Sequence, residues 1–143
     1  MRIFFDMASV MWTGLRAGKD VEGVEVVHNG KTMLVNSAGY GYENCVNHIV
    51  SALKRWNLTP KDMVMVFEGK DSKKRRCMIL TEYKAKRDDN KCPEMYIQYN
   101  LLKDKLMQVF RDLGAIAVTQ NFVEGDDVLA WLAQNTEEDC VVS

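Results

Sequence analysis

The sequence lacks the features that mark membrane, secreted and metal-thiolate proteins. None of its apolar runs approaches the roughly 18 residues that a membrane-spanning helix needs. Its beginning, MRIFFDMASVMW, contains an acid and only one base, which argues against a secretory signal peptide. The four cysteines are widely spaced without a C-x-x-C pair, so zinc and redox motifs have no support. We therefore expect free thiols in a reducing cytoplasm, and no membrane partner.

The usual signatures of nucleophilic and nucleotide-binding enzymes are also missing. The two histidines, His28 and His48, are isolated, and no Ser/His/Asp or Cys/His triad can be argued. The phosphate-loop pattern G-x-x-x-x-G-K-[ST] is absent, since NGKT at 29–32 shares only its end. No repeat or low-complexity linker divides the chain, so we expect a single domain over residues 1–143.

What the sequence does contain is an alternation of short apolar runs and helical patterns. Apolar residues make up 47% and charged residues 27%, which is typical of a globular domain with a real core. Continuous apolar strands alternating with helices favour an α/β fold, with a parallel central sheet and helices on both faces. The expected order is a strand (RIFF), an Asn-Gly hairpin within 24–35, a helix over 40–56, a strand (MVMVF), a basic insert, a helix over 93–113, a strand (AIAV), a helix after Phe122 and a strand (CVV).

Charge is distributed unevenly along the chain, although the net charge is only −1. Residues 70–91 hold nine Lys/Arg against four Asp/Glu, and the remainder holds ten bases against sixteen acids. From Phe122 onwards there are six acids and no base. A basic segment facing an acidic cluster suggests a polyanion held next to metal ions. Two solvated faces of opposite sign are the alternative.

Five carboxylates are expected at one edge of the sheet, beyond the carboxyl ends of its strands, where ligands bind in such folds. Asp6 and Glu68 each end an apolar strand, while Glu124, Asp126 and Asp127 follow the AIAV strand. Carboxylate ligands select Mg²⁺ or Mn²⁺ rather than zinc. Each acid also has a structural explanation. Asp126 and Asp127 suit the first turn of a helix, Asp6 suits a cap, and Glu68-Gly69 suits a turn.

The basic segment, KDSKKRRCMILTEYKAKRDDNK, has two interpretations as well. Its Lys and Arg could neutralise phosphates, while Tyr83 stacks on a base and the neighbouring Lys84 meets a phosphate. The alternative is a solvated amphipathic helix.

Three blocks resemble the 5′ nuclease or flap endonuclease family, particularly phage 5′–3′ exonucleases and the 5′-nuclease domains of bacterial DNA polymerases. IFFDMASVMW is similar to the family's opening strand with its metal-binding Asp. VFEGKDSKKRRCMILTEYKAKR is similar to the family's FD-x-K…R…EYK-x-x-R pattern, and VEGDDVLAWLA is similar to its E-A-D-D-V-L-A block. Together the blocks and their spacing cover most of the chain.

The resemblance implies a PIN-like core whose basic segment, about 70–92, forms an arch over the active site. It implies two Mg²⁺ or Mn²⁺ ions and a DNA substrate with a 5′ end or flap, or an RNA–DNA hybrid. Arg76 and Lys84 would contact the scissile phosphate, and Tyr83 would stack near the 5′ nucleotide. The implied metal ligands are Asp6, Glu68, Glu124, Asp126 and Asp127. The implied strand-binding residues also include Arg87, Lys86, Lys73, Lys74 and Arg75. If a phage encodes the chain, its compartment is the host cytoplasm.

The chain departs from the family pattern in three places. Glu68 stands where Asp is usual, and Thr13 stands where the family has Arg, with Arg16 three residues further on. The family's further D-x-D pair would fall just after Ser143, and its helix-turn-helix module is missing. We therefore expect an N-terminal part of a metal-dependent 5′–3′ exonuclease or flap endonuclease. The alternatives are a non-catalytic nucleic-acid-binding module, half of a split nuclease completed by a partner chain, or a PIN-fold ribonuclease.

Overall fold

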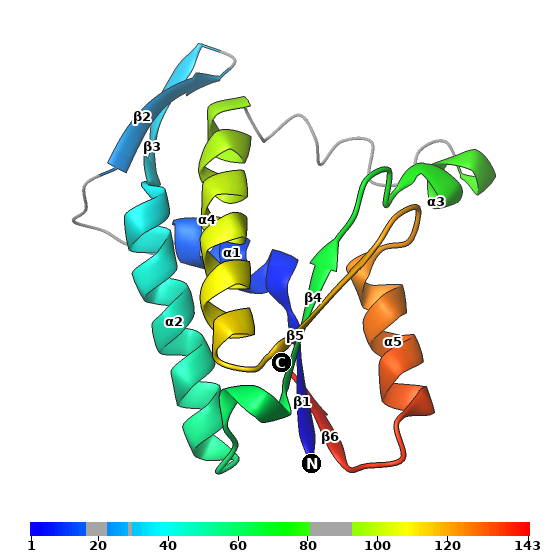
Figure 1. Cartoon of the computed structure of the whole chain (residues 1–143). Coiled ribbons are helices and arrows are strands. Elements are labelled where there is room, and N and C mark those ends of the chain that lie inside the picture. Colours follow the sequence, from blue (N-terminus) through cyan, green and yellow to red (C-terminus); the bar gives the residue numbers. More distant parts are fainter. Residues whose placement is uncertain (17–22, 29, 81–92) are drawn as a thin grey trace.

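The computed structural model describes residues 1–16, 23–28, 30–80 and 93–143, and it has an α/β architecture (Figure 1). A four-stranded parallel sheet forms its centre, in the order β5-β4-β1-β6. The strands are β1 (Arg2–Asp6), β4 (Met63–Glu68), β5 (Ile116–Gln120) and β6 (Cys140–Val142). The predicted parallel α/β sheet is confirmed at this level.

Helices cover both faces of the sheet. Three of them, α1 (Met7–Arg16), α2 (Ala38–Arg55) and α4 (Pro93–Asp112), share the larger core on one face. On the other face α5 (Gly125–Asn135) packs against β1 and β4 (Figure 1). Within the described ranges, no helix is long and apolar enough to cross a membrane.

Alternation along the strands assigns each side chain to a face. In β1, Ile3 and Phe5 join the larger core, whereas Phe4 belongs to the smaller cluster with Leu129 of α5. In β4 the same alternation places Met65 in the larger core and its neighbours Val64 and Val66 on the α5 side. If this alternation continues to the last residue of each strand, Asp6 and Glu68 lie on the α5 side of the sheet.

Helix α1 was missed by the sequence prediction, which passed directly from the first strand to the hairpin. Its buried residues Met7, Val10, Met11 and Leu15 follow the spacing of one helical face. Two short apolar runs, one in β1 and one in α1, are contiguous in sequence, and this continuity concealed the boundary at Asp6.

The Asn-Gly hairpin was predicted correctly. Strands β2 (Gly23–His28) and β3 (Lys31–Asn36) pair antiparallel, with His28 opposite Lys31 across a two-residue loop. Gly30 has φ +74°, a left-handed conformation that glycine adopts without penalty.

Helix α4 begins and ends as its sequence predicts. Pro93 is its first residue, where a missing N–H costs nothing. At its end, Gly114 has φ +98°, its N–H bonds the carbonyl of Arg111, and the N–H of Ala115 bonds the carbonyl of Phe110. This pattern is a Schellman cap, and it turns the chain directly into β5.

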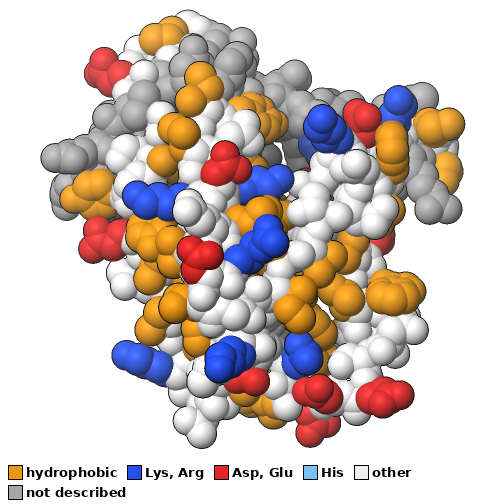
Figure 2. All heavy atoms as spheres, in the orientation of Figure 1, with side chains coloured by type: hydrophobic (Ala, Val, Ile, Leu, Met, Phe, Trp, Pro, Cys, Tyr) orange, Lys and Arg blue, Asp and Glu red, His pale blue; other side chains and the backbone are white. Residues whose placement is uncertain are grey.

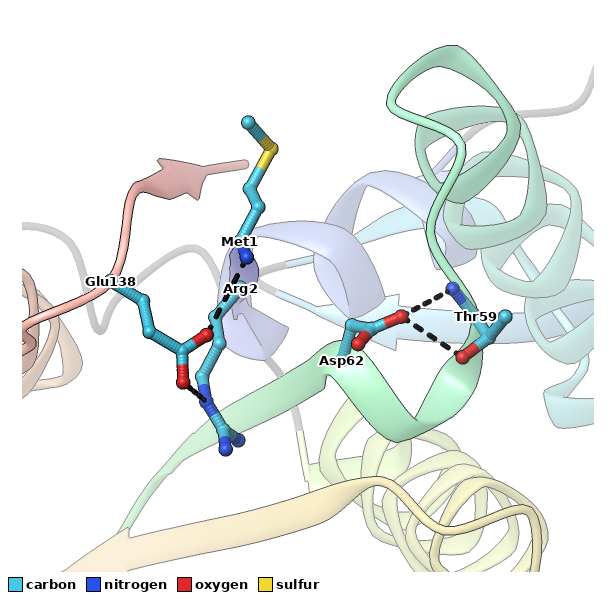
Figure 3. A network of polar contacts seen from close by, with 5 residues as sticks. All are labelled: Met1, Arg2, Thr59, Asp62 and Glu138. Carbon is cyan, nitrogen blue, oxygen red and sulfur yellow. Dashed lines mark hydrogen bonds and ion pairs between the residues drawn. The ribbon is translucent and has the colours of Figure 1, made fainter.

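Polar contacts lie near the amino ends of β1, β4 and β6 (Figure 3). Glu138, just before β6, meets the amino group of Met1 at 3.5 Å and Nε of Arg2 at 3.6 Å. In the 3₁₀ turn η1 (Pro60–Asp62), Asp62 accepts hydrogen bonds from the backbone N–H and the hydroxyl of Thr59. These two bonds hold the pKa of Asp62 below its ordinary value.

Cys45 lies in the close contact between α1 and α2. Its Sγ donates to the carbonyl of Val10 at 3.5 Å, and a Cβ added at Gly14 would lie 2.6 Å from that sulfur. Burial raises the pKa of the Cys45 thiol to about 12.

We therefore expect Cys45 to resist iodoacetamide in the folded protein at mildly alkaline pH. A pKa shift from 9.0 to about 12 lowers the thiolate fraction about a thousandfold, and burial blocks access as well. Timed labelling followed by peptide mass spectrometry would measure the rate, with the partly exposed Cys140 as the internal comparison. Equal labelling of Cys45 in buffer and in concentrated urea would contradict the burial.

Candidate functional site

Two carboxylates end neighbouring strands at the carboxyl edge of the sheet. In the β1–β4 register Asp6 is the partner of Val66, so Glu68 lies two residues further along the adjacent strand. Neighbouring strands are about 4.8 Å apart and each residue rises about 3.3 Å, so the two backbones come close at this edge.

Asp6 is also the N-cap of α1. Its Oδ1 accepts a hydrogen bond of 3.1 Å from the N–H of Ser9, three residues into the turn. The backbone of Asp6 is fixed as well, because its N–H donates to the carbonyl of Ser143 at 2.9 Å. The capping explanation is therefore confirmed, and it uses one oxygen of the carboxylate.

Glu68 meets the amino end of α5. A Cβ added at Gly125 would lie 3.5 Å from Cγ of Glu68 and 3.9 Å from its Oε1. The Glu68 side chain therefore lies near the first residue of α5, and its charge is favoured at a helix amino end. On the other side of the strand, Lys103 of α4 donates to the backbone carbonyl of Glu68 at 3.4 Å.

The three acids of the VEGDD block surround the start of α5. Glu124 is the N-cap residue and is only 1% exposed, the one buried charged side chain among the residues described. Its backbone carbonyl accepts from the N–H groups of Asp127 and Val128, at 3.1 and 3.2 Å. Asp126 and Asp127 are exposed in the first turn, as the helix-dipole explanation expects.

The charges of both strand-end acids affect the pKa of Tyr99 on α4. Burial raises the pKa of its phenol most, and the charges of Glu68 and then Asp6 raise it further. The two carboxylates thus lie close enough to one phenol for both fields to act on it. Tyr99 was not among the predicted site residues, because its place in a helical pattern does not distinguish it from a core residue.

The oxygen donors at this edge suit a hard divalent ion in chemical type. However, no three acidic, histidine or cysteine side chains of the described chain are grouped closely enough to hold a metal ion. Asp6, Glu68 and the start of α5 share one edge, but a preassembled cluster of the five acids is not seen.

Basic residues border the acidic edge. A cavity of about 550 Å³ opens between α4 and the segment after β4, and Figure 2 shows Lys and Arg side chains gathered in this region. Its basic lining residues are Lys70, Lys73 and Lys103. Of these, Lys70 and Lys73 belong to the basic segment whose Lys and Arg were expected to neutralise phosphates, and Lys73 was named as a strand-binding residue. Lys103 lies on α4, outside the basic segment, and was not among the predicted residues.

The rest of the predicted basic site is described only in part. Lys74 is exposed at the start of the short helix α3 (Lys74–Ile79), and Arg75 and Arg76 follow it there. The remaining predicted residues, Tyr83, Lys84, Lys86 and Arg87, lie outside the described residues.

Two hydrogen bonds join the loop after β4 to the loop before α5. The N–H of Lys70 donates to Oδ1 of Asn121, and the N–H of Phe122 donates to the carbonyl of Lys70, both at 3.0 Å. Phe122 takes a left-handed φ of 63°, which costs about 1–2 kcal/mol in a residue with a side chain. The pair of bonds, here called the loop clasp, keeps the loops carrying Glu68 and Glu124 side by side.

Comparison with known proteins identifies no family for this chain: no family model, curated protein or solved structure matches it significantly.

Proposed function

We propose that this chain is the PIN-like nuclease portion of a metal-dependent 5′ nuclease. Its substrate would be DNA, or an RNA–DNA hybrid, with a 5′ end or 5′ flap. The observation that carries the proposal is the position of Glu68 near the start of α5, on the strand beside Asp6 and at a lysine-lined cavity. At this one edge of the sheet, carboxylate oxygens that can bind metal ions lie next to lysine ammonium groups that can bind a phosphate chain.

The acids would hold one or two Mg²⁺ or Mn²⁺ ions, and Asp6 and Glu68 are the ligands contributed by the strands. When bound, such ions lower the pKa of a water and offset charge on the phosphoryl group. Lys73 and Lys103 at the cavity would draw the phosphate backbone toward the acids. The sequence resemblance implies that segment 70–92 would form an arch over the site, and that its Arg76 and Lys84 would neutralise the scissile phosphate.

The direct test uses 5′-labelled flap DNA and single-stranded DNA with Mn²⁺ or Mg²⁺, and EDTA as the blank. We expect metal-dependent release of short 5′-phosphorylated fragments. Asp126→Ala is the matched inactive control, because an exposed first-turn acid contributes only about 0.3–1 kcal/mol to its helix. Cleavage by Asp126→Ala at the rate of the parent chain would refute the metal-ligand assignment.

One observation favours a second candidate, a nucleic-acid-binding half that needs a partner chain. The described acids form no group of three, and in this candidate a second polypeptide supplies further ligands to the metal site. The same assay distinguishes the two, if it is repeated with the product of any adjacent reading frame. Cleavage only in the mixture would indicate a split enzyme, and binding without cleavage in either case would indicate a non-catalytic module.

A further inference from the structure

The cavity beside Glu68 has an aromatic wall in addition to its lysines. Trp12 from α1 and Tyr96 and Tyr99 from α4 line it, together with polar side chains from the loops opposite. Its volume of about 550 Å³ is in the range of small-ligand sites. The sequence-based site did not include this wall, because Trp12 lies more than eighty residues from the two tyrosines.

The three rings form a layered arrangement. Trp12 and Tyr99 stack with their centroids 4.5 Å apart and their planes at 20°, and Tyr99 is partly buried. Tyr96 meets Trp12 edge to face, at 5.6 Å and 90°. Arg16 lies 5.6 Å above the Trp12 ring and helps to fix it. The stacked pair therefore supports Tyr96, which lines the cavity and is 39% exposed.

The charge of the cavity is positive on balance. Lys70, Lys73 and Lys103 oppose the single carboxylate of Glu68 among its lining residues. Lys103 is held in place, because its Nζ lies 3.4 Å from the carbonyl oxygen of Glu68 and 5.7 Å from the centroid of the Phe67 ring. A fixed ammonium group and an exposed aromatic ring that line one cavity suit one phosphate with its attached base.

We propose that this cavity binds one unpaired nucleotide of the substrate strand. The base stacks against Tyr96, and the adjoining phosphate is bound by Lys103 and Lys73. This inference extends the proposed function, since it places the unpaired strand on the α4 side of the acidic edge. Stacking requires only a π-face, so the site accepts any base.

The test measures binding in EDTA, so that cleavage plays no part. The probe is a 5′-phosphorylated five-nucleotide thymidine oligomer, followed by tryptophan fluorescence in a Trp56→Phe/Trp131→Phe background. Both replaced tryptophans are exposed, at 44% and 62%, so Trp12 becomes the single reporter at little cost. We expect the probe to quench Trp12 fluorescence. Tyr96→Ala should raise the Kd about tenfold, whereas Tyr96→Phe should retain affinity.

Charge is tested with a matched pair of lysines on α4. Lys103→Gln should weaken binding and reduce its salt dependence. Lys105→Gln should do neither, because Lys105 lies over Tyr42, 5.0 Å from the ring centroid, and does not line the cavity. An oligomer of abasic residues should bind equally to the Tyr96→Ala variant and the background protein, since it has no base to stack.

Two results would overturn the inference: unchanged affinity in Tyr96→Ala, or saturation of the probe without a change in Trp12 fluorescence. Either result could occur while flap cleavage remains intact. It would then contradict the nucleotide site and leave the nuclease proposal unaffected. Conversely, Tyr96-dependent binding without any metal-dependent cleavage would support the site and refute the nuclease proposal.

Discussion

Asp6→Asn is expected to lower the rate of metal-dependent DNA cleavage roughly a hundred- to a thousandfold, while the fold is retained. Asparagine keeps the side-chain oxygen that accepts the 3.1 Å hydrogen bond from Ser9, and it is as good an N-cap as aspartate. It removes the negative charge, which is the property that a hard metal ion requires of its ligands. The measurement is single-turnover cleavage of a 5′-flap substrate, with thermal unfolding recorded on the same samples.

Asp6→Ala provides the comparison that distinguishes the role of Asp6 as a helix cap from its proposed role as a metal ligand. It loses both the charge and the cap, so we expect the same loss of cleavage together with about 1 kcal/mol of lost stability. If Asp6→Asn cleaves normally and only Asp6→Ala is impaired, the residue is a structural cap and the proposed active site is wrong.

Gly69→Ala is expected to destabilise the protein by about 3 kcal/mol. A Cβ at this position would lie 2.4 Å from the carbonyl oxygen of Gln120 and 2.5 Å from Oδ1 of Asn121. The first of these atoms belongs to the backbone, so a side-chain rotation cannot relieve the clash. The loop clasp must open, and the contact of Glu68 with α5 is displaced with it. Urea unfolding followed by circular dichroism measures the change in the free energy of unfolding.

The matched control is Gly39→Ala, at the start of α2. There an added Cβ would meet only Oγ of Ser37, at 3.8 Å. Alanine is the better helix former, so we expect no loss of stability and a gain of up to about 1 kcal/mol. Equal stability of the two variants would show that the close approach at Gly69 is not maintained in solution.

Sequence patterns predicted the sheet well, because its signals are local. MVMVF is a buried strand because both of its faces are covered, and the Asn-Gly pair set the register of the hairpin. Helix α1 was missed because Asp6 ends a strand and caps a helix at the same position, with no intervening loop. Asp6 was recognised from the sequence as a possible cap, but the apolar residues on both sides of it did not mark where the strand ends and the helix begins.

The site was predictable only as far as its backbone positions. The strand-end location of Asp6 and Glu68 follows from topology, and it was foreseen. The burial of Glu124 and the effect of two acids on the pKa of Tyr99 depend on how α5 and α4 pack against the sheet. No local sequence pattern encodes this packing. The aromatic wall depends on contacts between α1 and α4, for the same reason.

The loop clasp has a consequence for the motions of the acidic edge. The amide of Lys70 is bonded across to Asn121, and the amide of Phe122 is bonded back to Lys70, so neither loop can open without breaking the other's bonds. Glu68 and Glu124 therefore share one local-unfolding equilibrium rather than two. A ligand that binds to either acid lowers the population of the opened state for both acids. Binding at Glu68 therefore also stabilises the closed position of Glu124, and the reverse.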